Sequence, residues 1–157
     1  GAALLQEKIV ATASDQMIVI ADIAKEVSQL GAFPLPVEVI PFGWQTTKAL
    51  IEETLVGLDV MNRDCSLRMN GAKPLITDEA NYIIDLHLKR IGNPRQLAMV
   101  LNQIPGVVEN GLFIDICDIV VIGHGDGRVT VRDINEGTEA DDFIEFAPTD
   151  NIFADME

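Results

Sequence analysis

Two short runs of consecutive apolar residues, about one hundred positions apart, constrain the fold of this chain most. They are Met17–Ala21 and Ile119–Ile122. A strand that is apolar without alternation is typical of a parallel sheet covered on both faces. We therefore expect both runs to lie in one parallel sheet, which the chain leaves near the rigid stretch Phe33–Pro36 and re-enters near Asp118.

The segment between these two runs has an element order of its own. We expect strands near 37–40, 58–69, 82–88 and 107–113, and helices near 44–56 and 93–103. The second helix has a clear start, because Asn93 suits the N-cap and Pro94 suits the first helical position. This β-α-β-β-α-β order predicts a ferredoxin-like α+β unit.

The expected fold class is therefore α/β: a partial Rossmann-like parallel sheet domain with an inserted ferredoxin-like (βαββαβ) lid domain. The first domain would take residues 1–35 and 118–157, and the lid would take residues 36–117. Helices are also expected from Ala2 to Ser14 and from Ile23 to Leu30, the second one ending at Gly31.

The parallel sheet predicted in this way is small, because it holds the two apolar runs and one edge strand at Val129 and Val131. Such a sheet is not expected to be stable alone. The chain also opens on a helix with no strand before it. We therefore expect that a piece of the protein on the N-terminal side is missing.

The charge distribution excludes one class of partner. The formal net charge is −14, and residues 133–157 hold nine acidic residues without a Lys or Arg. A nucleic-acid surface needs clustered positive charge, so we expect no nucleic-acid partner. The acidic segment is expected to run over the surface, with Asp141 and Asp142 as solvated charges. Some of its apolar residues are expected to dock: Phe143, Ile144, Phe146, Ile152 and Phe153.

The composition also indicates the cellular compartment in which the protein is expected. Cys65 and Cys117 have no CxxC spacing and are expected to be reduced thiols. No apolar run approaches about 18 residues and no signal peptide is visible, which predicts a cytoplasmic protein without a membrane partner. No His, Cys, Asp and Glu grouping has metal-ligand spacing, and His124 lies in a glycine-rich turn, 123–127, that we interpret as a hairpin loop.

The residues with chemical interest lie in the first twenty-five positions. Glu7 falls near the start of the first helix, and Asp22 and Lys25 follow the first apolar run. The carboxyl ends of parallel strands are where open α/β sheets bind ligands, so this carboxylate and this ammonium group could face one cleft. Without further information, the more common role for residues such as Glu7 and Lys25 is that of solvated surface residues.

Four stretches of the sequence resemble type A ribose-5-phosphate isomerase. They are Gly1–Ile9 (GAALLQEKI), Ile20–Lys25 (IADIAK), Leu30–Pro41 (LGAFPLPVEVIP) and Ile104–Phe113 (IPGVVENGLF). The resemblance runs from Gly1 to about Val131, and Phe-Pro-Leu-Pro-Val-Glu-Val is its most specific part. Gln6 stands where the relatives commonly have Arg.

The resemblance implies an enzyme that interconverts ribose 5-phosphate and ribulose 5-phosphate through a cis-enediolate in the pentose phosphate pathway, without metal or organic cofactor. Glu7 matches the general base, Lys25 a substrate-binding lysine, and Gly1 the end of a substrate-binding glycine turn. Homodimers or homotetramers are implied as well. The family's lysine, first two glycines and phosphate-binding loop precede Gly1 in the relatives, so we expect this chain alone to be inactive.

Two other functions are compatible with parts of the pattern. Residues 36–113 alone would permit a non-catalytic ferredoxin-like module that binds a small molecule or drives oligomerisation. A regulator that senses sugar phosphates is disfavoured, because the chain has no basic DNA-binding segment.

Overall fold

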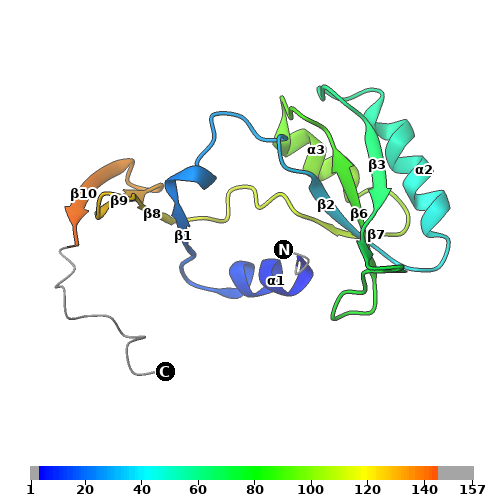
Figure 1. Cartoon of the computed structure of the whole chain (residues 1–157), viewed down its shortest axis with the longest axis horizontal. Coiled ribbons are helices and arrows are strands. Elements are labelled where there is room, and N and C mark those ends of the chain that lie inside the picture. The colour runs from blue at the N-terminus through cyan, green and yellow to red at the C-terminus, as the bar shows by residue number, and fades with distance from the viewer. Residues whose placement is uncertain (1–3, 145–157) are drawn as a thin grey trace. The chain divides into compact units, whose positions relative to one another are not determined.

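The computed structural model describes residues 4–144, which form two compact units of mixed α/β structure (Figure 1). Unit 1 contains residues 4–14 and 28–116, and unit 2 contains residues 15–27 and 117–144. The helix that carries Glu7 thus belongs to the same unit as the central segment of the chain. Across residues 4–144, no helix is both long and apolar enough to cross a membrane.

Unit 1 is built around a four-stranded sheet in which all neighbouring strands are antiparallel, with the order β3-β6-β2-β7. Its elements are α1 (Leu5–Ala13), β2 (Leu35–Val39), α2 (Trp44–Leu55), β3 (Asp64–Leu67), β4 (Met69–Asn70), β5 (Lys73–Pro74), β6 (Tyr82–His87), α3 (Pro94–Leu101) and β7 (Val107–Asn110). Strands β4 and β5 form a separate hairpin. Without that hairpin, the order from β2 to β7 is the β-α-β-β-α-β order expected from the sequence.

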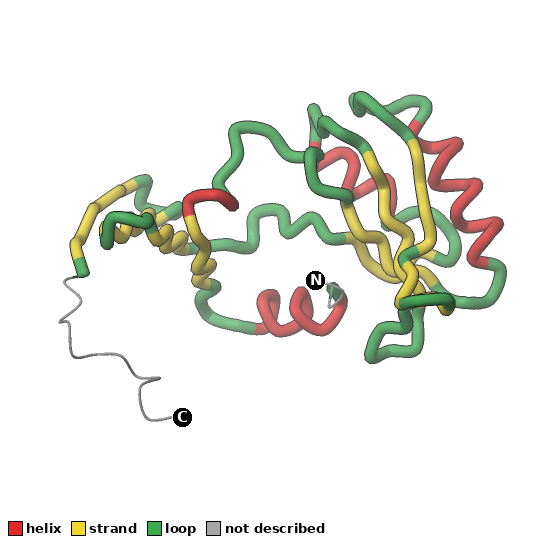
Figure 2. Tube along the Cα trace, in the orientation of Figure 1, coloured by secondary structure: helices red, strands yellow, loops and turns green. Residues whose placement is uncertain are grey.

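The core of unit 1 lies between one face of this sheet and the helices α2 and α3 (Figure 2). Alternate strand residues point into it, as the period of two in a strand requires. The main contributors are Val37, Val39, Ile84 and Leu86 from the sheet and Ile51, Leu55, Leu97 and Leu101 from the helices. Helix α3 begins as predicted, since the Asn93 side chain accepts a hydrogen bond from Gln96 N at 3.0 Å.

The prediction of a helix from Ile23 to Leu30 is wrong. Only a single 3₁₀ turn forms, Ile23–Lys25, and Glu26 is already extended with φ −77° and ψ 120°. The Asp22 side chain caps this turn by accepting a hydrogen bond from Ala24 N at 2.9 Å.

Gly31 therefore does not end a helix, and its position has another cause. Its φ is +118°, and an added Cβ would lie 2.8 Å from backbone atoms of Arg90. The neighbouring Leu30 carbonyl accepts a hydrogen bond from Ile91 N at 2.8 Å. A glycine is needed here because two backbone segments approach closely.

Unit 2 is a second four-stranded sheet with the order β1-β8-β9-β10. Its strands are β1 (Ile18–Asp22), β8 (Ile119–Gly123), β9 (Arg128–Asp133) and β10 (Thr138–Phe143). The predicted parallel pairing of the two apolar runs is confirmed, with Ile18 opposite Ile119 and Asp22 opposite Gly123. The expected burial of both faces of the first run is wrong: Ile20 is 78% exposed, because no described element of unit 2 packs over that face.

The acidic segment after Asp133 is more structured than predicted. Strand β10 pairs with β9 along its whole length. Asp141 is not a purely solvated charge, since Thr130 Oγ1 donates to it at 2.6 Å and Arg128 Nη1 at 3.3 Å. The Thr130 hydrogen bond and the Arg128 guanidinium lower the pKa of the Asp141 carboxyl. Phe143 and Ile144 are exposed, whereas Phe146, Ile152 and Phe153 lie outside the described residues.

Candidate active site

Helix α1 carries the predicted base, Glu7, on its exposed side. Glu7 lies in the first turn, where a negative charge is favoured by the exposed backbone N–H groups of the helix start. Among residues 4–144, none donates a hydrogen bond or forms an ion pair with the Glu7 carboxylate. No described residue therefore occupies the Glu7 carboxylate, which is available to bind a ligand.

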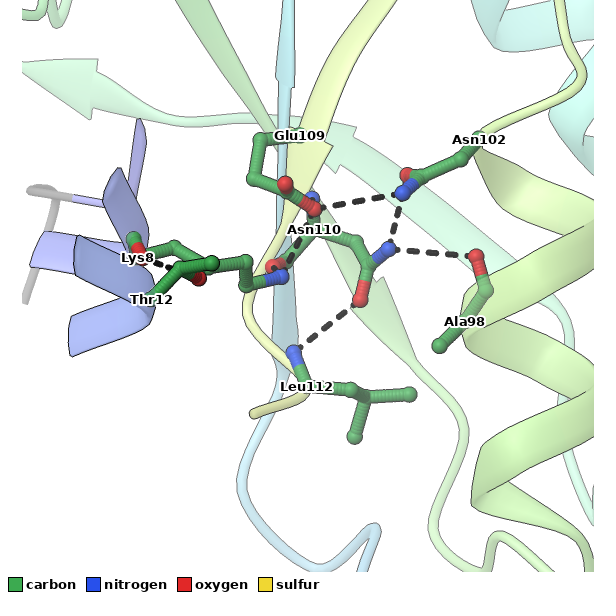
Figure 3. Close-up of polar contacts among 7 residues, drawn as sticks. All are labelled: Lys8, Thr12, Ala98, Asn102, Glu109, Asn110 and Leu112. Atoms are coloured by element: carbon green, nitrogen blue, oxygen red, sulfur yellow. Dashed lines mark hydrogen bonds and ion pairs between the residues drawn. The ribbon is translucent and has the colours of Figure 1, made fainter. Parts of the chain in front are cut away.

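The residue next to Glu7 holds the helix in place. Lys8 Nζ donates to Glu109 Oε1 and to the Asn110 carbonyl, both at 2.7 Å (Figure 3). The same ammonium group lies 5.0 Å from the centre of the Phe113 ring, within cation–π range. Lys8 and Glu109 are both mostly buried, with side-chain exposures of 16% and 14%. These contacts tie α1 to the end of β7.

The end of β7 is in turn fixed to helix α3 through Asn110, which is fully buried. Its amide nitrogen donates to the Ala98 carbonyl at 3.2 Å and to Asn102 Oδ1 at 2.8 Å. Its amide oxygen accepts from Leu112 N at 3.0 Å. Figure 3 shows this arrangement, with Lys8 of α1 on one side of β7 and the α3 residues on the other.

An open groove of about 340 Å³ lies between α1 and β7. It is lined by Leu5, Lys8, Ile9, Thr12, Ala13 and Glu109. Glu7 does not line it, so the groove lies beside another face of the helix from the one that carries the predicted base.

The other predicted site residues belong to unit 2 or lie outside the description. Lys25 is exposed in the 3₁₀ turn directly after the carboxyl end of β1, as expected, and Asp22 caps that turn. Gly1 lies outside the described residues. Glu7 belongs to unit 1 and Lys25 to unit 2, so the common cleft stays a prediction.

His124 has a structural role in the turn between β8 and β9, consistent with the loop role predicted for it. Its Nε2 lies 2.9 Å from Thr130 Oγ1, and its Nδ1 lies 3.2 Å from Arg128 Nη2. Since the Thr130 hydroxyl donates to Asp141, His124 Nε2 donates to Thr130 and Nδ1 accepts from Arg128. Within the described part of the chain, no group of three or more His, Cys, Asp and Glu residues could hold a metal ion.

Sequence reasoning missed the Lys8–Glu109–Asn110 contacts. The sequence points to Glu7 rather than to its neighbour Lys8, and it marks Glu109 and Asn110 only as part of a stretch that resembles the family. The available signal was the pair of polar residues at the end of an otherwise apolar strand segment, because polar side chains at such positions need partners.

Comparison with known proteins connects this arrangement to one family. The sequence model of ribose 5-phosphate isomerase A (phosphoriboisomerase A) matches residues 1–127. A "Ribose-5-phosphate isomerase A" from Ruegeria sp. (strain TM1040) is 76% identical over 156 residues, which is 99% of this chain and 60% of the relative.

Solved structures agree with the sequence comparison. A D-ribose-5-phosphate isomerase in complex with phospho-erythronic acid is 40% identical, with a TM-score of 0.71 over 82% of this chain and 54% of that one. Ribose 5-phosphate isomerase A from Methanocaldococcus jannaschii is 35% identical, with a TM-score of 0.70 over the same shares.

The chain spans about 60% of the length of the curated relatives it matches. The matched part includes α1, the 3₁₀ turn that carries Lys25, and all of unit 1. The chain belongs to the ribose 5-phosphate isomerase A family.

Proposed function

We propose that the protein carrying this chain is an aldose–ketose isomerase that interconverts ribose 5-phosphate and ribulose 5-phosphate, in the pentose phosphate pathway. The observation that carries the proposal is the family match over residues 1–127, which includes Glu7 and Lys25. The solved relative with phospho-erythronic acid supports a phosphorylated sugar-like ligand.

In this proposal Glu7 is the general base. Its carboxylate removes the proton from C2 of open-chain ribose 5-phosphate, leaving a cis-enediolate, and the resulting carboxylic acid returns the proton to C1. A hydroxyl proton moves from O2 to O1, so atoms and charges balance and no redox partner is needed. The carboxylate is exposed, has no ion-pair or hydrogen-bond partner among residues 4–144, and lies on a helix held by Lys8, which suits this role.

Lys25 and Gly1 are proposed as substrate-binding residues. An ammonium group just beyond the carboxyl end of β1 suits an anionic phosphate or the developing enediolate. Gly1 lies outside the described residues, and its proposed role rests on the resemblance of the stretch Gly1–Ile9 and on the family match, which includes it.

We assign residues 36–117 to a ferredoxin-like lid domain, and residues 1–35 and 118–157 to a Rossmann-like domain. This boundary differs from the division into compact units, in which residues 4–14 and 28–35 group with unit 1. The β-α-β-β-α-β order with antiparallel neighbours supports the first assignment, and the parallel β1–β8 pair supports the second. A homodimer or homotetramer in the cytoplasm fits the exposed Phe33 and Phe42 and the unpaired thiols. Light scattering tests the assembly directly.

A non-catalytic module is the other function compatible with unit 1 alone. It is not favoured, because the family match extends beyond residues 36–113 to the segments with Glu7 and Lys25. A pure binding module would have no need for the exposed Glu7 carboxylate on α1, which has no partner among the described residues.

The deciding experiment is turnover of ribose 5-phosphate by the full-length protein and by its Glu7→Gln variant. The variant should lose about 10²- to 10⁴-fold in kcat while remaining folded, because an amide cannot accept the C2 proton. Glu53→Gln is the matched control, since Glu53 is an exposed helix glutamate in α2. Activity of Glu7→Gln within tenfold of the control would remove Glu7 from the role of base.

A further inference from the structure

We propose that Lys8 is a positioning residue for the isomerisation: through Glu109 and the Asn110 carbonyl it fixes the helix that presents Glu7. The proposal rests on the assignment of Glu7 as general base. Lys8 acts through Glu7 and does not itself contact the substrate.

Helix α1 has few other contacts that hold it in place. No residue from Leu5 to Ala13 is buried, and Ile9 and Val10 are 58% and 65% exposed. An open groove separates part of the helix from β7. The apolar contact at the helix start comes from Leu4, which is 5% exposed. A helix with so small an apolar contact depends on its polar contacts for a fixed position.

The Lys8 ammonium group is already engaged within unit 1. Two of its three N–H donors point at oxygen atoms 2.7 Å away, and the group also lies over the Phe113 ring. Glu109 Oε1 is fixed as well, because it accepts from Asn110 N at 2.8 Å. An ammonium group held in this way has only one donor left and its charge is already balanced by Glu109, so positioning explains it better than substrate binding does.

Asn110, whose carbonyl accepts a hydrogen bond from Lys8, is held rigidly. Asn110 is completely buried and uses both ends of its amide, toward Ala98 and Asn102 of α3 and toward Leu112 N. Lys8 therefore links α1 to the packed core of unit 1 rather than to a surface loop (Figure 3). Glu7 is one residue away from this link, so displacement of Lys8 moves the carboxylate directly.

Proton transfer between adjacent carbons is sensitive to such displacement, since a shift of about 1 Å in a reacting group can cost roughly a hundredfold in rate. Loss of the Lys8 contacts should therefore lower kcat by about 10- to 100-fold. The KM for ribose 5-phosphate should change by less than about threefold, because the substrate-binding groups are elsewhere.

The experiment compares Lys8→Met, Lys8→Arg and Lys48→Met in the full-length protein. Lys48 is the matched control, because it forms a partly buried ion pair with Glu52 on α2 at 2.5 Å. We expect Lys8→Met to show the kcat loss, Lys8→Arg to recover most of it, and Lys48→Met to match the wild type. Kcat is expressed per folded enzyme, and hydrogen exchange of the α1 amides should be faster in Lys8→Met alone.

The outcomes separate this proposal from the proposed function. If Glu7→Gln retains activity, the assignment of the base fails. If Glu7→Gln is inactive but Lys8→Met keeps kcat within threefold of wild type, the positioning role fails while the isomerase stands. A large rise in KM with unchanged kcat would also overturn it, since that pattern places Lys8 on the substrate.

Discussion

Replacing Asn110 by alanine should destabilise unit 1 severely. The substitution leaves the buried Leu112 N without an acceptor and removes the donor to the Ala98 carbonyl. A buried polar group left unpaired costs about 1–3 kcal/mol, and the vacated amide adds a small cavity. The expected loss is about 3–5 kcal/mol, a large part of the roughly 5–15 kcal/mol that stabilises a typical domain.

The assay is urea unfolding followed by the fluorescence of Trp44. It is the chain's single tryptophan, it lies in unit 1, and its ring packs edge-on against Tyr82 with 6.5 Å between centroids. With an m-value of about 1–3 kcal/mol per M, the midpoint should fall by about 2 M.

Asn70→Ala is the control for this measurement, because Asn70 is exposed in the β4–β5 hairpin and its substitution should cost less than about 0.5 kcal/mol. Equal midpoints for Asn70→Ala and Asn110→Ala would refute the reasoning, since the buried amide would then contribute nothing.

Three further predictions concern other parts of the chain. Gly31→Ala should lower the urea midpoint by an amount equivalent to about 2–4 kcal/mol, because the φ of +118° at Gly31 and the Arg90 backbone, 2.8 Å from an added Cβ, exclude a side chain. A shift no larger than that of Asn70→Ala would contradict this. Burial, followed by nearby negative charge, raises the pKa of the Cys65 thiol from 9.0 to about 11. Iodoacetamide at about pH 8 should therefore react with Cys65 roughly a hundredfold more slowly than in the urea-unfolded chain, and equal rates would count against it. The hydrogen bond from Met17 N lowers the pKa of Asp118. The stability that the Asp118 carboxylate contributes is therefore complete above the unfolded-state pKa of about 3.9 and is lost as the pH falls through the lower native pKa. Unfolding followed by circular dichroism should depend less on acid pH for Asp118→Asn than for the wild type, and identical acid profiles would speak against this role.

Much of the fold could be predicted from the sequence because local signals agree with the packing. Alternation in β6 places Ile84 and Leu86 in the core, and the Asn93 cap gives the start of α3. The edge strand β10 could not be predicted in this way, since acidic residues are poor strand formers and its stability comes from pairing with β9. Pairing with β9, and not the strand propensity of its own residues, therefore determines the structure of this segment.

The candidate site could also be predicted only in part from the sequence. Glu7 and Lys25 were predicted from the resemblance, and the structure describes both as exposed residues near an element end. The Lys8 contact with Glu109 joins residues 101 positions apart. No local pattern reports such a contact, because it depends on how α1 packs against β7.

The measurement that tests the central claim most directly is solvent exchange during turnover in D₂O. With the full-length protein, NMR should detect deuterium on C1 of ribulose 5-phosphate as the equilibrium is approached, because a carboxylic acid that holds the C2 proton can exchange it with solvent. Glu7→Gln should incorporate none above the rate without enzyme. Undiminished exchange with Glu7→Gln would contradict proton transfer through this carboxylate.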